Sequence, residues 1–289
     1  RQLTRNRLTV GLPVAKQRKV MDQAGSLSFI PRSVTHLHDS LGGVEVDWLR
    51  PKDAANGSVM LYLHGGGYVL GNLKTHGELA GKLAAAASLN TVMPDYRLAP
   101  EHPFPAAMDD ALACYKALLD SGITANKILV GGDSAGGGLT LSLLLKLKEL
   151  GIEQPAAAYL ISPLTDLTFS GGSYQSREAV DPLLTFDWLN YGAKAYAGDN
   201  DLKHPLLSPL FADLTGLPPL MIQVGDDEIL LDDSVRFAEK AHSQGVSINA
   251  TVWPKMWHDF QASGFGLSEQ AEAIAEFGIF AAAHLKSDR

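Results

Sequence analysis

One serine in the chain stands in a sequence that suits nucleophilic catalysis. The segment Gly132-Asp133-Ser134-Ala135-Gly136 has the form G-x-S-x-G and falls between an apolar run at 127–131 and a helical pattern at 139–150. Glycines on both sides permit a turn tight enough to push the serine side chain out of the end of a strand. We therefore predict that Ser134 is a nucleophile.

Backbone N–H groups near this serine are predicted to stabilise an oxyanion. A helix that begins directly after Ser134 leaves the Ala135 N–H without a helical partner, at the positive end of the helix dipole. A second set of donors is expected in the glycine-rich segment after the apolar run 58–63, where Gly66 and Gly67 follow His64. His64 itself is interpreted as a structural anchor of that loop.

A serine hydroxyl needs an imidazole to accept its proton, and His258 is the predicted base. In chain order the acid and then the histidine are expected after the serine. Three histidines come late enough, but His242 and His284 fall inside helical patterns, whereas His258 lies between an apolar run and the last helix. The general base is therefore expected in this loop.

The acid of the triad is expected in the loop after the apolar run 219–224. That loop carries five carboxylates between Gly225 and Asp233. Asp226, Asp227 and Glu228 could each turn toward the carboxyl end of the strand. Spacing alone does not choose among these three.

Short apolar runs alternate with helical patterns along most of the chain, which is typical of an α/β sheet covered by helices on both faces. The runs at 58–63 and 127–130 are almost continuously apolar and predict central strands. Eight strands are expected near 34–39, 44–50, 58–63, 89–94, 127–132, 156–161, 219–224 and 247–253. Helices are expected at about 75–87, 106–121, 135–150, 232–244 and 268–286.

Two segments do not fit the alternation of strands and helices. More than fifty residues separate the strand at 156–161 from the next one, which is too long for a structureless loop, and residues 187–196 have helical spacing. Residues 1–30 also look helical without belonging to a strand pair. Together the two segments are predicted to form a lid.

Three motifs together resemble the hormone-sensitive lipase family of bacterial-type esterases. They are His64-Gly-Gly-Gly67, the segment from Asp95-Tyr-Arg-Leu-Ala-Pro to Phe104-Pro-Ala-Ala107, and Gly132-Asp-Ser-Ala-Gly-Gly137. The resemblance extends from about Val34 to the C-terminus. The segment 95–107 is interpreted as a rigid support for the glycine-rich loop, with Arg97 and Glu101 available to pair.

The resemblance implies an α/β-hydrolase fold: a mostly parallel eight-stranded sheet flanked by helices, with a helical cap. Residues 1–32 would form N-terminal cap helices, and residues 33–289 the catalytic domain with a cap insertion at about 165–215. The oxyanion donors would be Gly66, Gly67 and Ala135. The family signature G-D-x-D-P-L-x-D, laid over Gly225 to Asp232, puts Glu228 at the position of the acid, where the family usually has aspartate. Asp226 and Asp232 would then hold the loop through backbone hydrogen bonds.

The resemblance also implies hydrolysis of short acyl esters through an acyl-enzyme, without a cofactor. The same triad could serve an amide or formamide hydrolase or an acyltransferase. A non-catalytic small-molecule receptor on the same scaffold is disfavoured because all three triad residues are present. An acyl pocket is expected among Tyr68, Leu70, Leu183, Trp188, Tyr191 and Phe211.

Composition narrows the classes of partner. The net charge is −8 and the 24 Lys and Arg residues are scattered, so nucleic acid is not an expected partner. The chain has no apolar run of eighteen residues, so no membrane insertion is expected and a cytoplasmic location is predicted. His36 and His38 alternate on one strand without a third ligand, and no metal site is expected. A homodimer through the last strand, at the edge of the sheet, is a further expectation.

Overall fold

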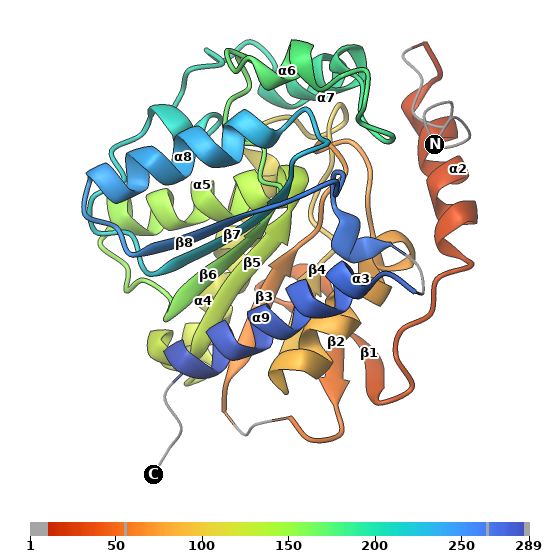
Figure 1. The fold of residues 1–289 in the computed structure, drawn as a ribbon. Coiled ribbons are helices and arrows are strands. Elements are labelled where there is room, and N and C mark those ends of the chain that lie inside the picture. Colours follow the sequence, from red (N-terminus) through yellow and green to blue (C-terminus); the bar gives the residue numbers. More distant parts are fainter. Residues whose placement is uncertain (1–10, 55–56, 264–265, 286–289) are drawn as a thin grey trace.

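Eight strands form one mixed sheet in the computed structural model, which describes residues 11–54, 57–263 and 266–285. Their order is β1-β2-β4-β3-β5-β6-β7-β8 (Figure 1). The first two strands pair antiparallel, β2 also pairs antiparallel with β4, and all remaining pairs are parallel. The strands are β1 (Val34–Leu41), β2 (Val44–Pro51), β3 (Val59–Leu63), β4 (Asn90–Pro94), β5 (Ile128–Asp133), β6 (Ala157–Ile161), β7 (Leu220–Gly225) and β8 (Ile248–Trp253). The predicted fold class, with eight strands, is confirmed.

Helices cover both faces of the sheet, as Figure 1 shows. Successive residues of β3 point to opposite faces, so Leu61 packs in the core beneath α4 and α5, and Met60 in the core beneath α3 and α9. A smaller core joins α5 and α8 to β6 and β7. The helices are α2 (Val14–Gly25), α3 (Leu73–Ala87), α4 (Ala106–Asp120), α5 (Ser134–Leu150), α6 (Ser173–Ser176), α7 (Phe186–Ala197), α8 (Leu231–Ser243) and α9 (Ser268–His284), with short 3₁₀ turns at Ala125–Lys127, Pro209–Phe211 and Phe260–Ala262.

The central strands place their carboxyl ends along one edge of the sheet, beneath the segment that contains α6 and α7 (Figure 1). Asp233 of α8 holds the start of this segment. Its Oδ2 accepts hydrogen bonds from the Thr165 N–H at 2.7 Å and the Asp166 N–H at 3.0 Å. Helix α2 lies beside the same edge. Residues 1–10 of the expected cap lie outside the described residues, and the boundaries of the cap stay a prediction.

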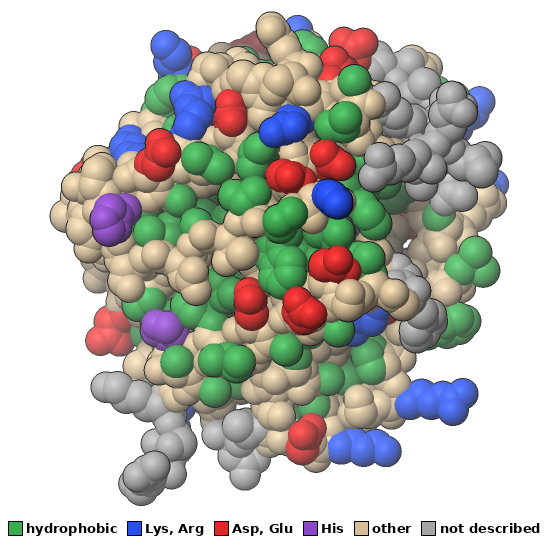
Figure 2. Space-filling model, viewed as in Figure 1, with side chains coloured by type: hydrophobic (Ala, Val, Ile, Leu, Met, Phe, Trp, Pro, Cys, Tyr) green, Lys and Arg blue, Asp and Glu red, His purple; other side chains and the backbone are tan. Residues whose placement is uncertain are grey.

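Charged side chains of both signs are interspersed with apolar ones on the face shown in Figure 2. No helix in the described ranges is long and apolar enough to cross a bilayer.

Candidate active site

Ser134 occupies a strained turn between β5 and α5. Its φ is 53°, in the left-handed region that non-glycine residues rarely adopt, and it is 3% exposed. A Cβ on Gly132 would overlap the Leu63 carbonyl oxygen, and a Cβ on Gly136 would overlap the carbonyl oxygens of Leu63 and His64. The glycines of the motif are therefore required because β3 passes against the turn.

His258 lies in the loop after β8, next to Glu228. Nδ1 of His258 lies 3.5 Å from Oε1 of Glu228, and both side chains are buried. Glu228 Oε2 is held by the Ser162 hydroxyl at 2.8 Å and by the Gly225 N–H at 3.1 Å. Burial raises the pKa of Glu228, against the lowering effect of His258.

Among the three carboxylates that spacing left open, Glu228 is the one that contacts the imidazole. Asp226 instead accepts a hydrogen bond from the Lys255 N–H, which ties the loop after β7 to the loop after β8. The backbone N–H of Asp227 donates to the Met256 carbonyl at 2.9 Å, a second tie between the same loops. The backbone role expected for Asp226 matches this arrangement.

Asp259 is a residue that the sequence did not single out. Its Oδ2 lies 3.1 Å from Nε2 of His258, while its Oδ1 is buried without a hydrogen-bond partner. Burial is the main cause that raises the pKa of Asp259 to about 6. Burial lowers the pKa of His258, because it disfavours the charged imidazole. The neighbouring carboxylates of Asp259 and Glu228 have the larger effect and hold this pKa well above its usual value.

The glycine-rich loop brings Gly66 and Gly67 to the same edge of the sheet, in left-handed backbone with φ of 114° and 61°. Across the described residues, neither N–H donates to another backbone group, so both are available to a ligand. A Cβ on Gly67 would meet the ring of Trp188, which packs directly against the loop. Gly66 lines the same cavity as Ser134 and His258.

Buried polar residues support this loop. His64 donates from Nδ1 to the Gly65 carbonyl at 2.8 Å and stacks on Tyr96, with ring centroids 4.2 Å apart. Burial lowers the pKa of His64 to about 3, so its ring is neutral at physiological pH. The Tyr96 hydroxyl donates to the His64 carbonyl at 2.6 Å. His64 is thus a structural residue of the loop.

Asp133, next to Ser134, faces into the protein. Its Oδ1 accepts a hydrogen bond from the Tyr62 hydroxyl at 2.5 Å, and its Oδ2 lies 3.3 Å from Nε2 of His76. Burial disfavours the charged carboxylate of Asp133, but His76 together with Tyr62 and His64 outweighs burial and lowers the pKa of Asp133. The contact of His76 of α3 with Asp133 was not predicted either, because a histidine within a helix and outside any motif gives no indication of its partner.

The segment 95–107 also contacts the loop, but its expected ion pair is wrong. The Ala99 N–H donates to the Tyr68 carbonyl at 2.9 Å, which supports the glycine-rich segment. Arg97 pairs with Asp110 of α4 at 2.7 Å, and Glu101 pairs with Arg18 of α2 at 2.8 Å. Both partners belong to other helices, which spacing within the segment cannot reveal.

Helix α2 and helix α7 meet over the glycine-rich loop. The indole N–H of Trp188 donates to Gln17 Oε1 at 3.0 Å, and Gln17 is buried. Arg18 Nε donates to the Val69 carbonyl at 2.8 Å. Both contacts tie the N-terminal helix to the wall of the candidate site.

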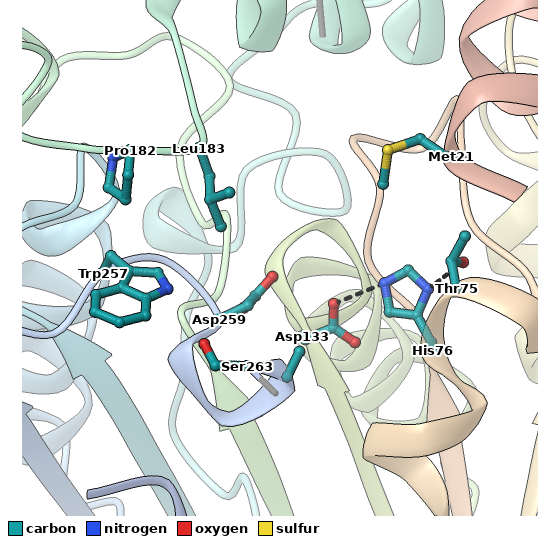
Figure 3. Close-up of a pocket in the computed structure, with 10 residues that line it drawn as sticks. Met21, Thr75, His76, Asp133, Pro182, Leu183, Trp257, Asp259 and Ser263 are labelled. Carbon is teal, nitrogen blue, oxygen red and sulfur yellow. Dashed lines mark hydrogen bonds and ion pairs between the residues drawn. The ribbon is translucent and has the colours of Figure 1, made fainter. Parts of the chain in front are cut away.

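Two neighbouring cavities open beside Ser134. The first, of about 140 Å³, is lined by Ser134, His258 and Gly66 together with Leu70, Leu183, Leu184 and Trp188. The second, of about 570 Å³, has Met21 of α2 and Trp257 in its wall. Figure 3 shows Asp259, Asp133 and His76 around this larger space. The two cavities share Met21, Thr75, His76, Leu183 and Asp259.

Three of the six expected pocket residues are placed elsewhere by the structure. Leu70, Leu183 and Trp188 line the smaller cavity. Tyr68 is fully buried and stacks on Tyr196, with ring centroids 3.7 Å apart. Tyr191 packs against the main core, and Phe211 is 37% exposed in the 3₁₀ turn at Pro209–Phe211. Aromatic residues at helical spacing belong to a core more often than to a pocket, and spacing does not separate the two uses.

His36 and His38 of β1 contact carboxylates of β2. Asp47 Oδ1 lies 2.7 Å from His36 Nε2 and 3.1 Å from His38 Nδ1, and Glu45 Oε2 lies 2.9 Å from His38 Nε2. Within residues 11–54, 57–263 and 266–285, no group of three His, Cys, Asp or Glu side chains has the arrangement to hold a metal ion.

Known proteins resemble this chain over most of its length. The family described as alpha/beta hydrolase fold matches residues 60–262. An esterase of Acinetobacter venetianus is 40% identical over 243 residues, covering 83% of this chain and 80% of its own. An acetyl-hydrolase of Streptomyces hygroscopicus is 38% identical over 262 residues, covering 91% and 86%. The crystal structure of a hormone-sensitive lipase from a metagenome library superposes with a TM-score of 0.95 at 39% identity, covering 99% of this chain and 97% of that one.

Proposed function

The chain belongs to the α/β-hydrolase family, as a carboxylesterase of its hormone-sensitive lipase branch, and we propose that it hydrolyses short-chain acyl esters with Ser134, His258 and Glu228. The observation that carries the proposal is the cavity of about 140 Å³ in which Ser134, His258 and Gly66 meet. Nucleophile, base and oxyanion donor thus face one space.

Acylation begins when Ser134 Oγ attacks the ester carbonyl carbon and its proton passes to Nε2 of His258. The carbonyl oxygen becomes an oxyanion, which the N–H groups of Gly66, Gly67 and Ala135 bind. Glu228 stabilises the imidazolium through Nδ1. The bond between the acyl carbon and the alcohol oxygen then breaks, and the alcohol leaves with the proton from Nε2.

Deacylation repeats these steps with water as the nucleophile. His258 takes a proton from water, the resulting hydroxide attacks the acyl carbon, and the same oxyanion donors act again. The bond to Ser134 Oγ breaks, and Oγ recovers the proton from Nε2. A carboxylic acid is released and the enzyme returns to its initial state.

The preference for short acyl groups is supported by the size and walls of the smaller cavity. Leu70, Leu184 and Trp188 close it around Ser134, and its volume is about one quarter that of its neighbour. We assign the acyl group to this cavity and the alcohol to the larger one. Apolar walls favour a hydrocarbon acyl chain over a charged one.

The function is tested with p-nitrophenyl butyrate and a Ser134→Ala variant. The wild type is expected to hydrolyse the ester, and Ser134→Ala to lower kcat by at least about four orders of magnitude because no other group can form the acyl-enzyme. Mass spectrometry after treatment with phenylmethylsulfonyl fluoride should show one adduct per chain, on Ser134. A wild type that leaves the ester intact, or a variant that keeps its activity and its adduct, would contradict the proposal.

A homodimer through β8 is a second part of the proposal. This strand is at the edge of the sheet and pairs only with β7 among the described strands. Val252 of β8 and Ile279 of α9 are apolar and exposed, at 42% and 74%. Light scattering after gel filtration should give twice the mass of the chain, and Val252→Lys should shift it toward one chain. A wild type that elutes as a monomer at all concentrations tested contradicts this part.

A further inference from the structure

The imidazole of His258 has a carboxylate on each of its nitrogens. Glu228 faces Nδ1, with 3.5 Å between Nδ1 and Oε1, and Asp259 faces Nε2, with 3.1 Å between Nε2 and Oδ2. The His258 side chain is 4% exposed, and the Asp259 side chain 16%. A buried imidazole between two carboxylates is stabilised in its protonated, charged form.

Nε2 is the nitrogen that has to receive the proton of the serine. Its recorded partner in the structure is the carboxylate of Asp259, and no hydrogen bond between Nε2 and Ser134 Oγ is found in the described part of the chain. A protonated Nε2 that forms an ion pair with a carboxylate cannot accept a proton from Ser134. The arrangement is therefore that of a base whose accepting position is occupied.

Other charged groups near His258 come from two neighbouring elements. Asp133 at the end of β5 and His76 of α3 face each other at 3.3 Å, and both line the cavity that Asp259 also lines (Figure 3). These two form an ion pair of their own, so Asp259 is the carboxylate with an immediate effect on Nε2. Across residues 11–54, 57–263 and 266–285, neither of the two cavities beside Ser134 has a Lys or Arg in its wall.

The backbone explains why a side chain at position 259 reaches back to the ring. The φ of Asp259 is 52°, in the left-handed region, where aspartate, asparagine and glycine are tolerated best. This turn directs the carboxylate toward Nε2 of the preceding residue. Asparagine and glycine at this position preserve the turn, and each removes the charge.

We propose that Asp259 is a positioning residue that holds His258 in a protonated resting form by pairing with Nε2, and so sets the pH at which Ser134 becomes nucleophilic. The proposal rests on the proposed function, because it takes His258 as the base. Only the neutral imidazole accepts the serine proton, so activity rises as the pH increases through the titration of His258. Removal of the Asp259 charge should move this rise to lower pH.

The test compares the pH dependence of kcat/KM for p-nitrophenyl butyrate between the wild type and Asp259→Asn. We expect the acid limb of the variant to lie lower by roughly one to three pH units, the usual effect of a neighbouring opposite charge. Asp226→Asn is the matched control, because Asp226 belongs to the neighbouring loop but contacts a backbone N–H and not the imidazole. Its acid limb should coincide with that of the wild type.

If Asp259 has a merely structural role, Asp259→Asn lowers kcat/KM without moving its acid limb, and that result overturns the proposal. An acid limb that moves to higher pH overturns it as well. Asp259→Gly provides a second variant if the asparagine protein does not fold. Titration of the His258 ring followed by NMR gives a readout that needs no ester. If the ring titrates at lower pH in the variant although no ester is cleaved, the Asp259 pairing stands and the proposed function fails. An unchanged titration overturns the pairing.

Discussion

Glu228→Gln is expected to lower kcat for a short-chain nitrophenyl ester by about four orders of magnitude, while leaving the fold intact. The amide oxygen can still accept from Ser162 and from the Gly225 N–H, which hold Oε2 in the wild type. The amide nitrogen would then face Nδ1 of His258 as a donor. Nδ1 would have to give up its proton, and Nε2 would carry it in the tautomer that cannot act as a base.

Asp226→Asn serves as the control for the identity of the acid. An asparagine oxygen can keep the hydrogen bond from the Lys255 N–H, and nothing at His258 changes. Activity within a few-fold of wild type is therefore expected. If instead Glu228→Gln stays active and Asp226→Asn loses its activity, the acid has been assigned to the wrong carboxylate. Circular dichroism of both variants checks that the comparison is made between folded proteins.

Gly136→Ala is expected to damage both stability and catalysis. Alanine in a helix is favoured over glycine by about 1 kcal/mol, which alone would stabilise α5. Here the added Cβ overlaps the carbonyl oxygens of Leu63 and His64, and backbone atoms cannot rotate aside as a side chain could. Overpacking of this kind costs about 1–3 kcal/mol or more, so the net effect is destabilising. Any relief of the overlap moves Ser134 and Ala135 away from Gly66, and a shift of about 1 Å costs roughly a hundredfold in rate.

Gly77→Ala in α3 is the matched control for this packing argument. Its Cβ would come closest to the end of the flexible Leu73 side chain, at 3.0 Å, where a small rotation removes the contact. This variant should melt at or above the temperature of the wild type and keep its esterase rate. Equal melting temperatures and rates for Gly136→Ala and Gly77→Ala would contradict this argument. They would show that the close approach of β3 to the turn at Ser134 does not require glycine at position 136.

The strands could be predicted, and Ser134 could be proposed as the nucleophile, because both depend on short stretches of sequence. Runs such as 58–63 are apolar at every position because both faces of β3 are buried, and the glycines beside Ser134 are fixed by a local turn. His258 could be proposed as the base from chain order, since only one late histidine fell in a loop. These features need no knowledge of which distant residues meet.

The features that were missed all depend on contacts between distant segments or on one backbone angle. His76 of α3 meets Asp133 at the end of β5 although the two residues are far apart in the sequence, and Arg97 and Glu101 each pair with a residue of another helix. Asp259 reaches the ring of its neighbour because of a left-handed φ, which no spacing rule predicts. Glu228 could be proposed as the acid, among three carboxylates, only through the resemblance to the family signature.

The contacts of α2 with Trp188 and Val69 also matter for practical handling of the enzyme. Met21 of this helix belongs to the wall of both cavities, so a bulky group attached before Val14 would lie close to the path of the substrate. The end of α9 emerges at the opposite end of the molecule (Figure 1). Attachment to a solid support after His284 would therefore leave the substrate entrance open to solvent.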